Sequence, residues 1–309
     1  LAIAWSFQNI VTRIISFVVL KIRHAWVFEY KGTYQAQLLK RMLKPSISWS
    51  VMSLGTILIL QTGSLVIASY LGPTEVLSYD FTLKMCMAIL SLAMILANSS
   101  SPFISRSYAQ NDLKSVRIML FRNIKLGMIA TLFSAAYLAV YADIIVNYWL
   151  GSQKFTGFPI LWILLATIIL EAHHIIHAGA ATAAGKVVFG TIAIVAGVLN
   201  LIMALVAVRI FGVAGVAMAI LVSQMVTNNW YAPFISFKTF NLGYRKYFRF
   251  VIYPLVLFGV FIVGINIIIR PYFEQPGVFS IFSSLILSFL CAIVLYKIIF
   301  RYHKIEEMT

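Results

Sequence analysis

Long apolar runs, separated by short polar connections, cover most of the chain. Each run is long enough to cross a bilayer, because a transmembrane α-helix needs about 20 predominantly apolar residues. Strands of a membrane barrel would be shorter, about 10 residues, with alternating apolar and polar positions. We therefore predict an all-α integral membrane protein with about nine transmembrane helices, over residues 1–20, 46–70, 78–102, 123–142, 158–183, 187–208, 211–236, 248–269 and 277–299.

Composition agrees with this pattern and excludes a soluble globular domain. Hydrophobic residues occupy 61% of the 309 positions and charged residues only 11%, whereas soluble domains carry about 25% charged residues. Cys86 and Cys291 both fall within predicted spans, so they indicate neither a disulfide framework nor a metal site. The sequence starts inside the first apolar run, without an initiator Met or a signal peptide. We expect it to be the C-terminal part of a longer protein.

The net charge of +15 raises the question of a nucleic-acid partner, and the placement of Lys and Arg answers it. Connections on one side of the predicted membrane carry 19 of the 24 Lys and Arg, and the other side carries three, namely Lys154, Arg209 and Arg270. This asymmetry is the positive-inside pattern. It predicts that the connection at 21–45 and the C-terminus are cytoplasmic and contact anionic lipid headgroups, with no nucleic acid involved.

Three stretches resemble a transporter family. The first, "SLVIASYLGPTEVLSYDFTLKM", is followed by "NSSSPFISRSYAQNDLKSV" and later by "AAGKVVFGTIAIVAGVLNLIMALVAVRIFGVAGVAMAILVS". Their order and spacing over residues 45–236 resemble the polysaccharide flippases of the multidrug, oligosaccharidyl-lipid and polysaccharide exporter superfamily. The matching motifs are an "LG" turn at Leu71 and Gly72, a "GK" turn at Gly185 and Lys186, Asn200 before an apolar run, and an "FGxxGxA" link at Phe211, Gly212, Gly215 and Ala217.

The resemblance implies a fold and a domain organisation. Members of the family have two six-helix lobes around a central cavity, commonly two further helices, and an alternating-access mechanism. On this chain the resemblance implies that residues 1–20 are the last helix of the first lobe, 21–45 the cytoplasmic lobe linker, 46–236 the second lobe, and 237–309 the C-terminal helix pair with a cytoplasmic tail. The first five helices of the family have no counterpart in the sequence, so half of the cavity is expected to be missing.

The run "LEAHHIIHAG", residues 170–179, places ionisable side chains inside a predicted span. Such groups are costly within a membrane and are by default a hypothesis of function. Spacings of three residues predict that Glu171, His174 and His177 share one helical face. His173 points about 100° away from His174, although it pairs with His177 at i, i+4.

Three interpretations of this run stay open. Glu171 with His174 would take up a proton and couple it to a conformational change. Alternatively, His174 and His177 would hydrogen-bond sugar hydroxyls or a pyrophosphate, or all these groups would be neutral and satisfied by neighbouring helices. Zinc is not expected, because the run is not "HExxH" and has no second carboxylate nearby. We predict no metal and no cofactor.

Other polar residues within predicted spans are weaker candidates. Arg13 would bind a diphosphate through its bidentate fork, or would snorkel at the cytoplasmic mouth. Asp80 precedes Lys84 by four residues, so we expect a local ion pair in preference to a ligand site. Asn200 would line the lumen or pack helices, with packing as the default. Tyr and Trp residues near span ends, Tyr247 among them, are predicted to be interfacial anchors.

We predict a flippase for a polyprenyl-diphosphate-linked oligosaccharide of the O-antigen or capsule repeat type. It would work in the bacterial cytoplasmic membrane, driven by H⁺ or Na⁺, and would not be an enzyme. The nearest alternatives in the superfamily are a cation-coupled multidrug exporter and a peptidoglycan-precursor flippase. A membrane glycosyltransferase or polymerase, from a different class, usually needs a large outward loop, and the outward connections here are short. A structural membrane subunit is a further alternative.

Overall fold

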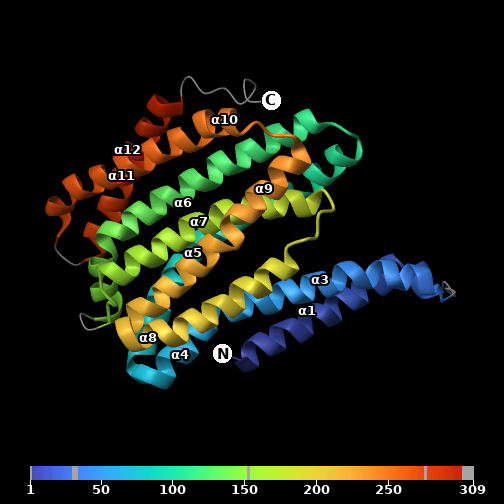
Figure 1. The fold of residues 1–309 in the computed structure, drawn as a ribbon, viewed down its shortest axis with the longest axis horizontal. Helices are drawn as coiled ribbons and strands as arrows, with labels where there is room; N and C mark the ends of the chain where they lie inside the picture. Colours follow the sequence, from blue (N-terminus) through green and yellow to red (C-terminus); the bar gives the residue numbers. More distant parts are fainter. Residues whose placement is uncertain (1, 30–33, 152–153, 275–276, 301–309) are drawn as a thin grey trace. The chain divides into compact units, whose positions relative to one another are not determined.

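The computed structural model describes residues 2–29, 34–151, 154–274 and 277–300, and every regular element in these ranges is a helix (Figure 1). This confirms the predicted all-α class. The elements are α1 (Ala2–Arg23), α2 (Trp26–Glu29), α3 (Ala36–Leu60), α4 (Thr62–Leu71), α5 (Pro73–Ala109), α6 (Leu113–Leu150), α7 (Phe158–Ala183), α8 (Gly190–Val226), α9 (Asn228–Phe240), α10 (Tyr244–Tyr247), the π-helix η1 (Phe248–Ile252), α11 (Tyr253–Ile269), the 3₁₀ helix η2 (Arg270–Phe273) and α12 (Val278–Phe300).

The chain divides into two compact units, Leu1–Pro45 and Ser46–Thr309. The division falls inside α3, at the residue where the sequence places the end of the predicted linker. Because α3 begins at Ala36, the last part of the predicted polar connection at 21–45 is helical. The assignment of lobes to these residues stays a prediction.

Seven helical segments within the described residues are long and apolar enough to cross a membrane. The predicted span 1–20 corresponds to α1, which is not among these seven. One segment, Gly190–Phe240, has 51 residues, or about 75 Å at 1.5 Å per residue, and a hydrocarbon core of about 30 Å is less than half as thick. This segment therefore accounts for two predicted spans, 187–208 and 211–236.

A turn at Gly212 separates these two spans. Gly212 has φ 57° and ψ −138°, a conformation that side-chain-bearing residues rarely adopt. Just beyond it, a Cβ on Gly215 would lie 2.2 Å from the carbonyl oxygen of Ala207, so the two parts of α8 approach each other more closely than any other residue would permit. The small residues of the "FGVAGVA" motif thus serve a tight reversal of the chain.

The sequence "YLGPTEV" ends one helix and begins the next. Helix α4 ends at Leu71, Gly72 has φ 96°, and Pro73 is the first residue of α5. Proline fits this position because the first helical N–H has no intrahelical acceptor in any case. Glu75 lies in the first turn of α5, where the helix dipole favours a negative charge.

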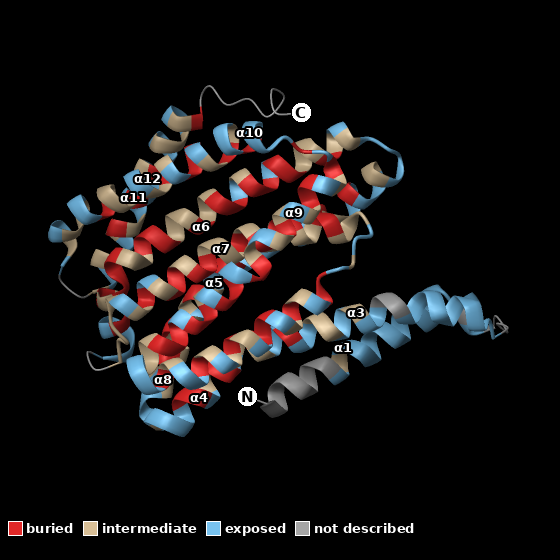
Figure 2. Cartoon of the chain, in the orientation of Figure 1, coloured by how far each residue is buried: buried red, intermediate tan, exposed pale blue. Residues whose placement is uncertain are grey.

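The core of the second unit lies along α5, α6 and α7, where buried residues are concentrated (Figure 2). Its largest fully buried side chains include Tyr79, Leu120, Ile124, Leu161 and Leu164. The outer faces carry many exposed large apolar side chains, as expected of helices whose surroundings are lipid.

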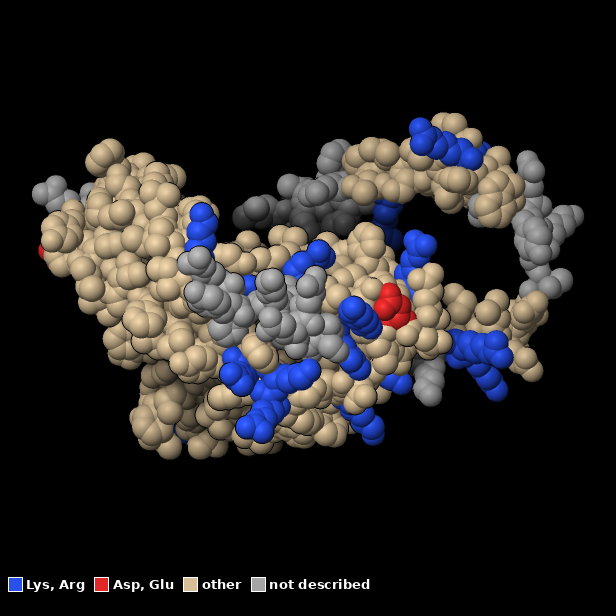
Figure 3. Space-filling view, turned by 90° about the horizontal axis from the view of Figure 1, so that it is seen from above, with Lys and Arg blue, Asp and Glu red and all other residues tan. Residues whose placement is uncertain are grey.

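Lys and Arg side chains gather toward one end of the second unit. The α5–α6 and α9–α10 turns lie at this end, at the upper right of Figure 1, and the α6–α7 and α11–α12 connections lie at the other. Figure 3 shows blue side chains over the corresponding part of the surface and a largely uncharged opposite end. This segregation of charge agrees with the alternation found in the sequence.

Candidate functional site

A cavity of about 390 Å³ opens within the second unit, between α3, α5, α7, α8 and α9. Most of its wall is apolar, with Trp49, Met87 and Phe189 among the lining residues. A smaller set of polar side chains faces the same space: Thr56, Asn98, Ser101, Thr167, Glu171, His174, Thr182, Gln224 and Asn228. An apolar wall with a few convergent polar groups is typical of ligand sites.

Glu171 and His174 reach this cavity from α7. Glu171 is half-buried, and its Oε2 atom is buried without a hydrogen-bond partner. The Nδ1 atom of His174 lies 2.8 Å from the backbone carbonyl oxygen of Asn228. Because a carbonyl only accepts, Nδ1 carries the hydrogen, and Nε2 of the neutral ring is then an acceptor.

The helical path of the chain is interrupted between α8 and α9, next to His174. Helix α8 ends at Val226 and α9 begins at Asn228, with Thr227 at φ −117° and ψ −81° between them. Asn228 is 5% exposed, and its Oδ1 atom has no hydrogen-bond partner. Both side-chain polar atoms of Asn229 are also buried without a partner. Irregular backbone at membrane depth occurs where it is buried in protein or lines a cavity, and helix breaks often mark binding sites in transporters.

His173 and His177 lie on a different side of α7 from Glu171. The Nε2 atoms of His173 and His177 lie 2.5 Å and 2.9 Å from the hydroxyl oxygen of Tyr247, and neither residue lines the cavity. The expectation that Glu171, His174 and His177 share one face is therefore wrong. At about 100° per residue, Glu171 and His174 are about 60° apart, but Glu171 and His177 are about 120° apart.

The hydroxyl of Tyr247 bridges the two imidazoles. A phenol has one hydrogen to donate, so it donates to one neutral ring and accepts from the other. His177 is fully buried and its Nδ1 has no partner. A bare Nδ1 there costs less than an orphaned N–H, which favours donation from Nε2 of His177 to Tyr247, and from Tyr247 to His173.

Tyr247 itself corrects a prediction. It is 6% exposed, and its ring packs against Phe237 with centroids 4.9 Å apart. The predicted role of an interfacial anchor is wrong for this residue, because its hydroxyl is hydrogen-bonded within the protein. Tyr244, three residues earlier, is 64% exposed.

The expected ion pair of Asp80 with Lys84 is also wrong. Ser64 of α4 donates a hydrogen bond to Asp80, Lys84 is exposed, and the two charged groups do not pair. The i, i+4 spacing permits such a pair, but the carboxylate of Asp80 accepts its hydrogen bond from Ser64 on the neighbouring helix.

Asn200 lies outside the cavity wall, and Arg13 belongs to the other unit. The Nδ2 atom of Asn200 donates to the carbonyl oxygens of Leu58 and Ile59 at 3.3 Å and 3.2 Å. These carbonyls belong to the last turn of α3, where helical acceptors lack partners, so Asn200 joins α8 to the end of α3. Arg13 is an exposed residue of α1, in the first unit.

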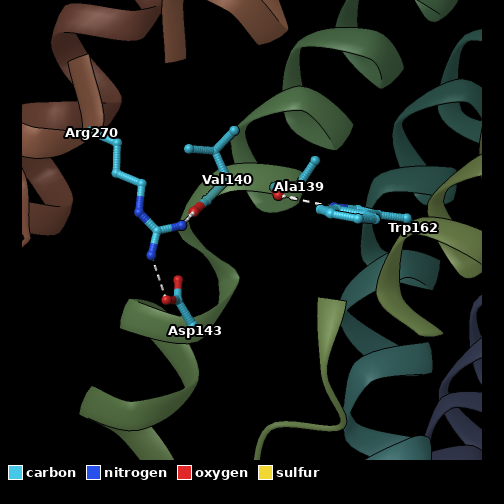
Figure 4. Close-up of polar contacts among 5 residues, drawn as sticks. All are labelled: Ala139, Val140, Asp143, Trp162 and Arg270. Carbon is cyan, nitrogen blue, oxygen red and sulfur yellow. Dashed lines mark hydrogen bonds and ion pairs between the residues drawn. The ribbon is translucent and has the colours of Figure 1, made fainter. Parts of the chain in front are cut away.

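A second polar group ties the end of α11 to α6 (Figure 4). Arg270 donates to the carbonyl oxygen of Val140 and forms an ion pair with Asp143 at 2.6 Å. On the other side of α6, the indole nitrogen of Trp162 donates to the carbonyl oxygen of Ala139 at 3.1 Å. The sequence identifies Arg270 only as a charge in a predicted outward connection, because its partner Asp143 lies 127 residues away.

Comparison with known proteins bears on this architecture. A model of the family described as "polysaccharide biosynthesis protein" matches residues 1–156. The chain belongs to this family. A solved structure, "Lipid II flippase MurJ, inward closed conformation", superposes with a TM-score of 0.65 at 14% sequence identity. The match covers 88% of this chain and 57% of that one, so the chain spans little more than half the length of the protein it resembles. A search of curated proteins found no match.

The predicted resemblance to the exporter superfamily is thereby confirmed, and so is a multi-pass membrane fold. For this member of the polysaccharide biosynthesis family, sequence reasoning found Glu171 and His174 because charge stands out in an apolar run. It missed Gln224 and Asn228, which the structure places on the same cavity wall. The triplet "TNN" at 227–229, polar within a predicted span, was the available signal.

Proposed function

We propose that the chain is part of a flippase that moves a polyprenyl-diphosphate-linked oligosaccharide across the bacterial cytoplasmic membrane for surface polysaccharide export. Membership of the polysaccharide biosynthesis family supports the glycan substrate class. The likeness of its fold to a lipid II flippase supports a transporter in preference to an enzyme. In this proposal residues 46–236 form the second lobe, 237–309 form the C-terminal helix pair and its tail, and the chain's basic end faces the cytoplasm.

The observation that carries the proposal is the set of polar side chains that line a cavity between apolar helices. A glycan crossing a bilayer must exchange its hydrogen bonds with water for hydrogen bonds with protein, because unpaired polar groups are expensive in hydrocarbon. The wall of amides, hydroxyls, Glu171 and His174 offers such partners. The polyprenyl chain, which is apolar, would stay in the lipid while the head group passes through the protein.

Glu171 and His174 support a coupling role for H⁺ or Na⁺ in the same cavity. A charged carboxylate inside a membrane costs about 2.5–3.5 kcal/mol when it has no partner, and the Oε2 atom of Glu171 has none. Binding of a proton or a cation would remove that cost in one state of the transport cycle. Direct hydrogen bonding of Glu171 to the glycan is the other role that its position supports.

A cation-coupled multidrug exporter is the second candidate. One observation favours it: the cavity wall includes one carboxylate and neither Lys nor Arg, a balance that suits cationic compounds. A glycosyltransferase has less support, because the α6–α7 connection, residues 151–157, is too short for a catalytic domain.

The test is genetic and is made in the native host with the full gene. The gene is deleted and then restored intact, as Glu171→Gln, or as Glu75→Gln; Glu75 is an exposed carboxylate at the start of α5 and serves as the control. Lipid-linked glycan and surface polysaccharide are quantified together. We expect deletion to abolish the surface polymer while single repeat units accumulate on the lipid carrier.

Glu171→Gln should fail to restore export, and Glu75→Gln should restore it. Normal surface polysaccharide after deletion, together with increased sensitivity to cationic drugs, would refute the glycan flippase and support the exporter. Full restoration by Glu171→Gln would leave flipping in place but remove Glu171 from its mechanism.

A further inference from the structure

Three residues that line the cavity each carry a hydrogen-bond acceptor without a partner. Glu171 Oε2 and Asn228 Oδ1 are buried, lack hydrogen-bond partners and belong to residues that line the cavity. His174 adds a third acceptor, since its Nδ1 hydrogen is used by the carbonyl of Asn228 and Nε2 is bare in the neutral ring. Asn228 is 5% exposed, so its carbonyl has little access to water as a substitute partner.

This set of atoms suits a ligand that donates hydrogen bonds. Sugar hydroxyls and amino groups donate, whereas the oxygens of an ionised diphosphate only accept and carry negative charge. Diphosphate sites use Arg, Lys or backbone N–H groups, and the lining residues include neither Arg nor Lys. A diphosphate in this cavity would meet the carboxylate of Glu171 and two further acceptors.

We propose that this cavity binds a sugar residue of the glycan through its hydroxyl or amino hydrogens and does not bind the diphosphate. The inference rests on the proposed function and specifies which part of the substrate the second unit recognises. The side-chain amides of Asn98 and Gln224 add donors that can meet ring or hydroxyl oxygens. Trp49 adds a flat apolar surface for the C–H face of a sugar ring.

The size of the cavity agrees with this assignment. Its volume of about 390 Å³ lies near the lower end of the range of about 300–1,000 Å³ for small-molecule sites. It therefore suits a small part of a lipid-linked oligosaccharide and not the whole head group. In this proposal the diphosphate is held outside the cavity wall.

Binding to the purified full chain tests the inference with two separate probes. One probe is the host's repeat-unit oligosaccharide, released from its lipid carrier and freed of phosphate; the other is inorganic pyrophosphate. Affinities are measured by titration calorimetry for the unmodified protein, for Glu171→Gln and for Asn228→Ala. Asn266→Ala is the matched control, because Asn266 is also a buried membrane-helix residue whose Oδ1 has no partner, but it lies outside the cavity.

We expect Asn228→Ala and Glu171→Gln each to weaken oligosaccharide binding about tenfold, which corresponds to about 1.4 kcal/mol. Pyrophosphate binding should be unchanged, and Asn266→Ala should bind the oligosaccharide normally. Glu171→Gln keeps the shape of a side chain whose Oε2 makes no hydrogen bond, so it remains informative if Asn228→Ala fails to fold.

Two results would overturn the inference while leaving the flippase standing. The first is unchanged oligosaccharide affinity in a folded Glu171→Gln protein, and the second is loss of pyrophosphate binding in either cavity variant. Absence of oligosaccharide binding to the unmodified protein also overturns it. The proposed function fails on a different measurement, namely when deletion of the gene leaves surface polysaccharide intact.

Discussion

Removing one oxygen atom, by Tyr247→Phe, should destabilise the second unit measurably. The hydroxyl of Tyr247 is the hydrogen-bond partner of Nε2 on both His173 and His177, at 2.5 Å and 2.9 Å. Without it, His177 would have no partner at either ring nitrogen, because its Nδ1 already has none. Phenylalanine keeps the ring and its packing against Phe237, so the change isolates the polar contribution.

Two estimates bound the size of the effect. Hydrogen bonds between membrane helices contribute about 0.6 kcal/mol each on average, so two bonds set a lower value of about 1 kcal/mol. Leaving a buried polar atom unsatisfied costs about 1–3 kcal/mol, and His177 is fully buried. We expect a loss of about 1–3 kcal/mol in the free energy of unfolding.

Reversible unfolding of the reconstituted protein, followed by circular dichroism, measures this loss. Tyr244→Phe is the control, since Tyr244 is 64% exposed and also stacks on Phe237, with ring centroids 4.4 Å apart. If both variants unfold within 0.5 kcal/mol of the unmodified protein, a threshold below the lower estimate of about 1 kcal/mol, the bridge described for Tyr247 contributes nothing. Oligosaccharide binding should be retained, because His173, His177 and Tyr247 do not line the cavity.

Two further predictions concern local backbone features. Gly215→Ala should sharply reduce the yield of folded protein, because its Cβ would lie 2.2 Å from the carbonyl oxygen of Ala207, whereas Gly264→Ala, which meets nothing within 4 Å, should express normally. Asp112 accepts a hydrogen bond from Ser115 at the start of α6, and bonds from this residue, its hydroxyl first, lower the pKa of the Asp112 carboxyl. Since the folded pKa is depressed, the cap's contribution is present above the unfolded pKa and is lost as pH falls through the folded one. The protection of the amides in the first turn of α6, measured relative to their intrinsic exchange rate at each pH, should therefore fall at acidic pH, and Asp112→Asn should remove that dependence.

The helices were predictable because each has a local cause. A run of about 20 apolar residues forms a helix in a membrane whatever its tertiary partners, since only internal hydrogen bonding satisfies its backbone. The stop at Gly72 and the start at Pro73 follow equally from the preferences of those two residues. The break at Thr227 was not predicted, because the polar triplet at 227–229 lies inside an apolar run long enough for a single span.

Only the part of the candidate site that lies on α7 was predicted from the sequence. Glu171 and His174 stood out by charge, and helical spacing relates them correctly. The bond from His174 to Asn228 spans 54 residues, and those from the histidines to Tyr247 span 70 or more. No periodicity within α7 reveals partners at such separations, and for the same reason Asp80 was assigned to Lys84 instead of Ser64.

The contacts of α6 with the last two helices have a consequence for experiments on motion. Tyr137 bonds Ser284 of α12 at 2.9 Å, and Arg270, at the end of α11, pairs with Asp143. The two bonds fix both partner helices to one stretch of α6, two turns long. Spectroscopic labels on the last turn of α6 and the first turn of α12 should thus keep a constant separation through the proposed transport cycle. This pair of labels gives a fixed reference distance, and displacements of the helices around the cavity can be measured relative to it.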